Sequence, residues 1–229
     1  MSISPAPGSV SRAPGDALAE LLAGNRRFVT GTRIHPHQDA DYRARLAAAQ
    51  RPFAVVFGCS DSRLAAEIIF DLGLGDLFVV RTAGHITGPE VLASIGFAVT
   101  VLRTPLVVVL GHDSCGAVHA AHTAVTTGAM SDPQLAPIVD RIAPTISHAH
   151  RQRITDPDAI AKLHVQHTVE LINQTPAFAR AGRDQHCAVV GMSYRLADGR
   201  VTLVTDGPPA STIDTKNGSE LGMNTRSEP

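Results

Sequence analysis

Short apolar runs and stretches of helical periodicity alternate along the middle of the chain. Each apolar run is followed by a segment in which apolar residues recur every three or four positions, as expected for a strand followed by a helix. This alternation favours an α/β fold, with a mostly parallel central β-sheet flanked by helices. The strands are expected at residues 53–57, 77–80 and 106–110, and the helices at 64–70, 89–102 and 115–126.

The regions on either side of this alternation add helices and one hairpin. Before it, an N-terminal helical arm is expected over residues 16–50, with Asp16 as the N-cap of its first helix. After it, two strands flank Ala197-Asp198-Gly199, and an Asp-Gly pair is a strong signal for a hairpin turn. We therefore expect an antiparallel hairpin at the C-terminal edge of the sheet. The remaining helices are expected at 41–49, 137–151 and 158–174, and the two strands of the hairpin at 187–194 and 201–205.

The two ends of the chain differ from its middle in composition. Residues 1–15 and 207–229 are rich in small and polar residues and proline, and such segments bury too little apolar surface to fold. We expect both to be disordered tails. Residues 16–206 are expected to form a single domain, since their number fits one hydrophobic core.

Composition and charge exclude several classes of function. The chain has 20 basic and 21 acidic residues, so it lacks the basic excess that nucleic-acid binding requires. No apolar run is long enough for a signal peptide or for a helix that crosses a membrane. Three cysteines are too few for a secreted disulfide scaffold. We therefore expect a cytoplasmic protein without a nucleic-acid or membrane partner.

Two glycine-punctuated turns directly follow expected strands. The first is Gly58-Cys59-Ser60-Asp61-Ser62-Arg63, and the second is Gly111-His112-Asp113-Ser114-Cys115-Gly116. In an open parallel sheet, ligands bind beyond the carboxyl ends of the strands, in the crevice where the winding reverses. If the two strands are neighbours, the two turns face each other across that crevice.

Together the turns offer two thiols and one imidazole, from Cys59, His112 and Cys115. This donor set suits Zn²⁺, and three protein ligands leave one position for water or substrate. Taken alone, His-x-x-Cys is a weak signal, but a second cysteine at another strand end makes it specific. The alternative is that these are ordinary buried side chains, with Asp61 and Arg63 as a structural ion pair.

The same two motifs resemble the signature of the β-class carbonic anhydrases, and the resemblance covers residues 18–205. It extends to three further segments, Glu67–Phe70, Asp76–Gly84 and Val108–His112. The resemblance implies a carbonate dehydratase that reversibly hydrates CO₂ to bicarbonate and a proton. It implies one Zn²⁺ per subunit, held by Cys59, His112 and Cys115, with zinc hydroxide as the nucleophile. Asp61, kept ionised by Arg63, would orient that hydroxide by accepting a hydrogen bond.

The resemblance also bears on the resting state of the site. In some family members the carboxylate equivalent to Asp61 binds zinc as a fourth ligand and closes the site. The pH-gated members have a Trp where this chain has Val56, so the open arrangement is favoured. Gln38 is expected to bind substrate across a dimer interface, and Gly116 is a further candidate for substrate binding. Phe53 and Val79 are candidates, with Gly116, for the lining of the CO₂ pocket.

Oligomerisation and proton transfer are further expectations. The helical arm, with Leu18, Leu21 and Leu22, is expected to have too little partner surface within one chain, and the family implies a dimer or a dimer of dimers. His35 and His37 are candidate proton shuttles near the expected site entrance. Cys187, in an expected strand, is interpreted as a core residue.

Two alternative functions stay open at this point. One is a zinc hydrolase of CS₂ or COS on the same scaffold. The other is a non-catalytic structural zinc module, in which Asp61 would be a permanent fourth ligand.

Overall fold

The computed structural model describes residues 12–130, 132–176, 178, 180 and 186–208. The tails expected at 1–15 and 207–229 lie mostly outside these residues, and their disorder stays a prediction. No helix in the described part of the chain is both long and apolar enough to cross a membrane.

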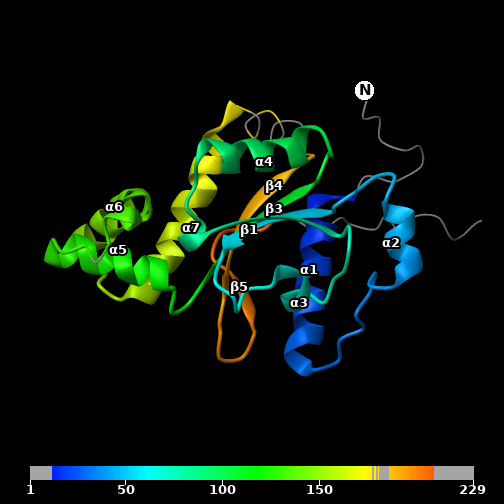
Figure 1. The fold of residues 1–229 in the computed structure, drawn as a ribbon, viewed down its shortest axis with the longest axis horizontal. Helices are drawn as coiled ribbons and strands as arrows, with labels where there is room; N and C mark the ends of the chain where they lie inside the picture. Colours follow the sequence, from blue (N-terminus) through cyan, green and yellow to red (C-terminus); the bar gives the residue numbers. More distant parts are fainter. Residues whose placement is uncertain (1–11, 131, 177, 179, 181–185, 209–229) are drawn as a thin grey trace, which may run out of the picture.

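A five-stranded sheet with the order β2-β1-β3-β4-β5 forms the centre of the molecule (Figure 1). Its first four strands in this order are parallel, and the last is antiparallel to its neighbour. This arrangement confirms the expected fold class, including the antiparallel pair at the C-terminal edge. The strands are β1 (Ala54–Cys59), β2 (Leu77–Thr82), β3 (Leu106–His112), β4 (Ala188–Tyr194) and β5 (Val201–Leu203).

The two central strands, β1 and β3, are buried along their whole length. They are parallel neighbours, with Val55 opposite Val107 and Gly58 opposite Leu110. Their carboxyl ends therefore lie side by side at one edge of the sheet. This is the position at which the two glycine-punctuated turns emerge.

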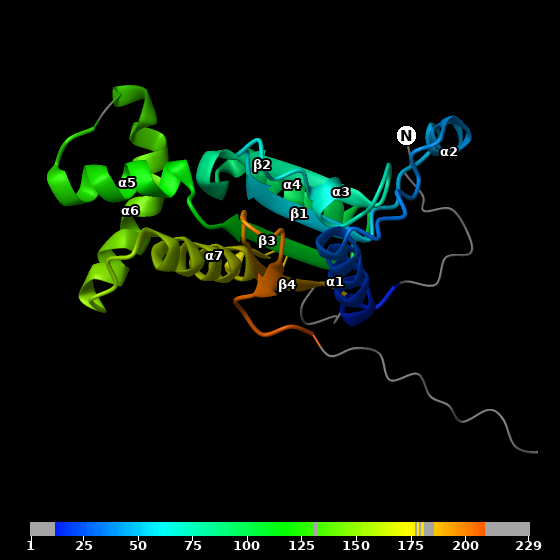
Figure 2. The same cartoon turned by 90° about the horizontal axis from the view of Figure 1, so that it is seen from below.

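Helices cover both faces of the sheet (Figures 1 and 2). One face packs against α4 and α7, and the other packs against α1 and α3. In both views α5 and α6 project beyond one end of the sheet and α2 lies beyond the other. The helices are α1 (Pro14–Thr30), α2 (Ala40–Leu46), α3 (Ala66–Ile69), α4 (Pro89–Thr100), α5 (Gly116–Thr127), α6 (Ala136–Arg151) and α7 (Pro157–Gln174), with short 3₁₀ helices η1 (Ala83–His85) and η2 (Pro133–Leu135).

The prediction of Asp16 as an N-cap is wrong. The first helix begins at Pro14, with Ala13 as its N-cap, because the fixed φ of proline suits the first helical position. Asp16 lies in the first turn instead, where its negative charge interacts favourably with the positive end of the helix dipole. Pro14 and Gly15 thus belong to α1 and not to the expected tail.

The helix expected at 64–70 is reduced to the four residues of α3. Its first part is used by the turn after β1, since the N–H of Leu64 donates to the carbonyl oxygen of Asp61 at 3.0 Å. The backbone of Ala65 is extended. The turn that carries Asp61 and Arg63 therefore consumes residues whose apolar pattern had suggested helix.

The first helix packs on the sheet of its own chain, contrary to the expectation that it would lack a partner surface there. Leu18 and Leu21 are buried in the core. The side chain of Asn25 is buried as well, donating to the carbonyl oxygens of Ile69 and Gly199 and accepting from the N–H of Val201. These contacts make α1 an integral part of the fold.

Candidate metal centre

Three metal-binding side chains meet at the carboxyl ends of the two central strands. Cys59 is the last residue of β1, His112 is the last residue of β3, and Cys115 directly precedes α5. Their ligand atoms all lie within 4.8 Å of one another, and all three residues are buried. The structure thus brings together the three residues that the sequence predicts as ligands.

The imidazole of His112 has a hydrogen-bond partner on one nitrogen only. Its Nδ1 donates to the carbonyl oxygen of Asp113 at 2.7 Å, which leaves Nε2 as an acceptor. This Nε2 is buried without a hydrogen-bond partner among the described residues. Buried polar atoms rarely lack a partner, and metal-binding histidines usually donate their other N–H to a carbonyl or carboxylate. The arrangement therefore fits a metal ion at Nε2.

The two sulfurs of the cluster lie 4.0 Å apart and interact. The hydrogen bond that Cys115 donates to Cys59 lowers the pKa of Cys59 and raises that of Cys115. The backbone N–H groups of Asp61 and Gly84 also donate to Sγ of Cys59, at 3.4 and 3.2 Å, and stabilise its thiolate. The thiolate is the form of cysteine that binds metals.

Gly84 supports the cluster in a way that requires glycine. Its φ of 65° lies in the left-handed region that glycine adopts freely. A Cβ atom at this position would lie only 2.9 Å from Cβ of Ala117 and 3.1 Å from Cδ1 of Ile142. The hydrogen bond from Gly84 to Cys59 could not be predicted from the sequence. The available signal was a glycine soon after an expected strand.

Asp61 and Arg63 form a bidentate ion pair in the first turn. Arg63 donates from Nε to Oδ1 of Asp61 at 2.9 Å and from Nη2 to Oδ2 at 2.6 Å. These hydrogen bonds hold the pKa of Asp61 well below its usual range. Oδ2 of Asp61 also lies 3.9 Å from Nε2 of His112. The carboxylate is therefore next to the metal-binding cluster while Arg63 holds both of its oxygens.

Arg81 fastens this first turn to the neighbouring strand. It lies opposite Gly58 in the pairing of β2 with β1. Its guanidinium donates to the carbonyl oxygens of Cys59 at 3.0 Å and Asp61 at 2.6 Å. Arg81 thus fixes the backbone on both sides of Ser60.

The second turn is held by hydrogen bonds to two segments that are distant in the sequence. Asp113 accepts a hydrogen bond at 2.8 Å from the N–H of Leu196, in the hairpin after β4. Asp158, at the start of α7, accepts one at 2.7 Å from the N–H of Ser114, whose φ is 50°. Both contacts depend on tertiary packing and stabilise the backbone between His112 and Cys115.

A small hollow next to Cys59 is lined mainly by apolar side chains, including Val56, Leu64 and Val79. Val79 was expected in such a position. The prediction that Phe53 lines the same pocket is wrong within one chain. Phe53 precedes the first residue of β1, whereas Cys59 is the last residue of that strand. Gly116 begins α5 next to Cys115, and no heavy atom lies within 4 Å of where its Cβ would be.

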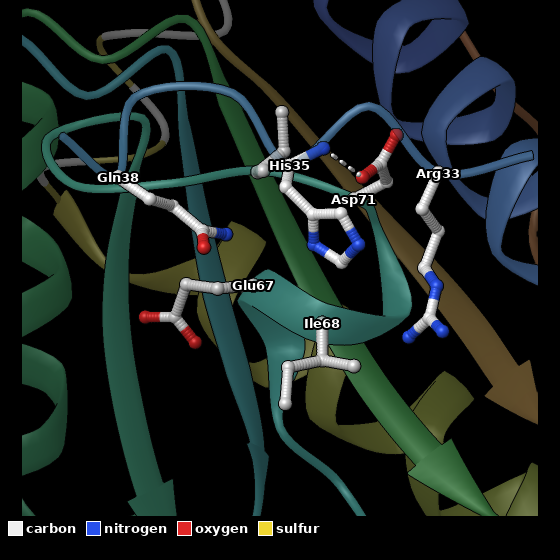
Figure 3. A pocket seen from close by; sticks show the side chains of 7 residues that line it. Arg33, His35, Gln38, Glu67, Ile68 and Asp71 are labelled. Carbon is white, nitrogen blue, oxygen red and sulfur yellow. Dashed lines mark hydrogen bonds between the residues drawn. The ribbon is translucent and has the colours of Figure 1, made fainter.

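Gln38 lies in a separate pocket of about 190 Å³. Figure 3 shows Gln38 and His35 pointing toward Glu67 and Ile68, which belong to α3. None of the residues that line this pocket is one of the three metal-binding residues. Within one chain, the structure therefore does not bring Gln38 to the cluster.

The two candidate proton shuttles lie on the same side of the molecule as Gln38. His35 lines the pocket of Figure 3. Nδ1 of His37 lies 2.9 Å from both carboxylate oxygens of Asp76, and its ring stacks on Tyr42. A role in proton transfer stays a prediction for both histidines.

Comparison with known proteins gives a consistent result. The sequence model of the carbonic anhydrase family matches residues 54–201. Carbonic anhydrase 2 of Mycobacterium tuberculosis is 49% identical over 191 residues, which are 83% of this chain and 92% of that protein. A carbonic anhydrase of Mycolicibacterium smegmatis is 50% identical over 191 residues, or 83% of this chain and 93% of that one.

Solved structures agree with these sequence relatives. A β-carbonic anhydrase of Aspergillus fumigatus is 26% identical, with a TM-score of 0.65 over 83% of this chain and 93% of that one. A tetrameric β-carbonic anhydrase of Sordaria macrospora is 24% identical, with a TM-score of 0.67 over 85% of this chain and 100% of that one. At this lower identity, the second comparison supports the fold alone.

Proposed function

This chain belongs to the β-class carbonic anhydrases, and from that premise we propose how it hydrates CO₂. We propose that Cys59, His112 and Cys115 hold one Zn²⁺ per chain. The observation that carries this proposal is the buried Nε2 of His112, which has no hydrogen-bond partner among the described residues and lies within 4.8 Å of two sulfurs. When bound, zinc would lower the pKa of a coordinated water toward neutrality and so supply the nucleophile.

Asp61 is proposed to orient that nucleophile, while Arg63 holds Asp61 away from the metal. An Asp with a strongly lowered pKa stays ionised at neutral pH and can only accept hydrogen bonds. Its Oδ2, 3.9 Å from Nε2 of His112, is close enough to accept one from a water beside the ligands. The three hydrogen bonds from Arg63 support an open resting state, in which Asp61 is not a fourth ligand.

The apolar side chains beside Cys59 are proposed to form part of the wall against which CO₂ binds. The substrate has no dipole, so it gains little from hydrogen-bond donors and is best bound by apolar side chains such as Val56, Val79 and Leu110. Gly116 is proposed to contribute to substrate binding because it has no side chain, which leaves open space beside Cys115 at the start of α5.

Gln38 is proposed to bind substrate in the metal centre of a second subunit. Its place in a pocket that none of the three metal-binding residues lines supports this role, because a partner subunit would then bring Gln38 to a metal centre. A homo-oligomer, either a dimer or a dimer of dimers, is consistent with the tetrameric relative from Sordaria macrospora. We further propose a cytoplasmic location, in keeping with the three cysteines, which form no disulfide among the described residues.

The proposed function is tested by stopped-flow CO₂ hydration together with zinc analysis of the purified protein. Wild-type protein should contain one zinc per chain and should already be active near neutral pH. Cys59→Ala, His112→Ala and Cys115→Ala should each lose zinc and activity. Cys187→Ala is the matched control, since Cys187 is also a buried cysteine but lies outside the cluster, among residues of the other core face.

Three outcomes would contradict the proposal. Zinc retained by all three ligand variants would place the metal elsewhere. Activity confined to alkaline pH would place Asp61 on the metal in the resting state. Hydrolysis of CS₂ or COS without CO₂ hydration would keep the metal site but change the substrate.

A further inference from the structure

Two histidines on neighbouring helices approach each other far from the sheet. His122 lies on α5 and His150 lies on α6, and their Nε2 atoms are 3.4 Å apart. The two helices pack side by side where they project beyond the sheet (Figure 1). Neither histidine contributes to the candidate metal centre.

The distance between the two nitrogens fits a shared metal ion better than a shared proton. Zn–N bonds of about 2.0–2.1 Å at the tetrahedral angle place two ligand nitrogens about 3.3–3.4 Å apart. Hydrogen bonds donated by nitrogen are usually about 2.7–3.2 Å long, so the observed 3.4 Å is long for such a bond. The rings are nearly perpendicular, with an interplanar angle of 80°, so they do not stack on each other.

The surrounding histidines have other contacts. His148, two residues before His150, accepts a hydrogen bond at 2.9 Å from the side-chain amide of Gln152. His119, one turn before His122, has its Nε2 4.0 Å from a carboxylate oxygen of Asp158. Among the described residues, three or more potential ligands converge only at the Cys59 cluster. A metal at His122 and His150 would therefore have two protein ligands, with water completing its coordination.

We propose that His122 and His150 form a second metal site, which takes a divalent transition-metal ion such as Zn²⁺ or Ni²⁺ in an exchangeable manner. Neutral imidazole is a favourable ligand for these ions, and the half-buried pair is reachable from solvent. Two protein ligands bind a metal more weakly than three buried ones, so this site fills only after the first. The bound ion cross-links α5 to α6. Because α5 begins directly after Cys115, the cross-link stiffens the helix next to the catalytic cluster.

The experiment is a calorimetric titration of the full-length zinc enzyme, holding one zinc per chain, with Ni²⁺ as the probe. Wild-type protein should bind one further equivalent of Ni²⁺, and its thermal unfolding midpoint should rise with Ni²⁺ concentration. His122→Ala and His150→Ala should bind this equivalent at least about tenfold more weakly. His122→Gln is a second variant that keeps side-chain size and hydrogen bonding but removes the imidazole.

The matched control is His119→Ala, which removes an exposed histidine from the same helix and should bind Ni²⁺ as wild type does. All of these variants should retain the first zinc and the CO₂ hydration of the wild type, so failure of this proposal is distinct from failure of the proposed function. The proposal is overturned if wild-type protein takes up no further equivalent. It is also overturned if the His122 and His150 variants bind Ni²⁺ as tightly as the wild type.

Discussion

Among the side chains of the site, Asp61 combines a strongly lowered pKa with a position next to the imidazole of His112. The hydrogen bonds from Arg63 keep its carboxylate ionised, and its Oδ2 lies 3.9 Å from Nε2 of His112. An acceptor at this place can orient a water molecule without binding the metal. Its contribution is therefore electrostatic and depends on its negative charge.

Asp61→Asn tests this role, because asparagine keeps the shape of the side chain but removes the charge. Loss of one such preorganised group typically costs about 10²–10³ in rate, so kcat for CO₂ hydration should fall by about this factor. Zinc content should stay at one per chain. The control is Asp198→Asn, which breaks the exposed Arg195–Asp198 pair in the hairpin turn and should leave the rate unchanged. Wild-type activity in Asp61→Asn would show that the charge of Asp61 does not contribute to catalysis and that its pair with Arg63 is only structural.

His164 is a buried residue with a consequence for stability. Burial lowers its pKa to about 4, and burial also lowers the pKa of His85, whose ring lies 4.5 Å away. The folded state therefore keeps His164 neutral at a pH where the unfolded state already binds a proton. As pH falls below about 6.5, protons favour the unfolded state, and this penalty grows until the folded pKa is reached.

We predict that His164 alone removes about 2 kcal/mol of stability between pH 7.5 and pH 5. Urea unfolding of wild type and His164→Asn at the two pH values measures this difference. The variant should lose less stability on acidification than the wild type by about this amount. Equal losses in both proteins would show that His164 does not stay neutral in the folded state.

At the scale of secondary-structure elements, the short helix η1 positions the sulfur of Cys59. It follows β2 and contains Gly84, whose N–H donates to that sulfur. Replacement of Gly84 by alanine would place Cβ 2.9 Å from Cβ of Ala117 and force a shift of η1. The N–H of Gly84 would then leave Sγ of Cys59, to which it donates at 3.2 Å. We predict that Gly84→Ala weakens zinc binding about tenfold or more and destabilises the fold by about 1–3 kcal/mol.

Competition with a zinc chelator and thermal unfolding measure these two effects. Gly96→Ala is the control, since Gly96 lies within α4 and no heavy atom lies within 4 Å of its added Cβ. Alanine is the better helix former, so this control should be stabilised by about 0.5–1 kcal/mol. Zinc affinity unchanged in Gly84→Ala would mean that η1 does not support Cys59.

The elements differed in how far the sequence could predict them. The existence of β1 and β3 could be predicted from their continuous apolar runs, but their carboxyl ends could not, because the strands continue through Gly58 and Gly111 to Cys59 and His112. From the rule for parallel strands, the two turns at these ends were expected to meet. The start of α3 could not be predicted, because Leu64 and Ala65 share the apolar pattern of a helix while a hydrogen bond from Leu64 to Asp61 closes a turn.

Considering the molecule as a whole, Gln38 and the metal centre of the same chain occupy different pockets. If Gln38 serves a partner subunit, two inactive variants should complement each other. In a mixed dimer of Gln38→Ala and Cys59→Ala chains, one centre combines an intact ligand set with an intact Gln38. One of the two centres in each mixed dimer is then complete, so the purified mixed dimer should have about half of the wild-type activity.

Co-expression of the two variants, with purification through a tag on each, supplies the mixed dimer. Each variant expressed alone is the control and should be nearly inactive. Activity of the mixture equal to the sum of the two separate variants would assign Gln38 to its own chain.

Contacts between distant segments account for what sequence alone could not reveal. The apolar residues of α1 indicated a helix but not its partner, and Asn25 completes that packing with Ile69 and Val201. Likewise, the support of Ser114 by Asp158 joins residues that share no local motif. The ligands could be predicted because each motif is short and local, whereas their supports come from the packing of the chain as a whole.

The position of β4 in the sheet affects what happens while the chain is being synthesised. All three ligands have been made by residue 115, yet β4, which pairs with the whole length of β3, begins only at Ala188. At about 5–20 residues per second, the ribosome needs roughly 4–15 s to make the intervening segment. During this interval β3 has no neighbour on that side, so the nascent chain exposes His112 and the thiols of Cys59 and Cys115 before its sheet is complete.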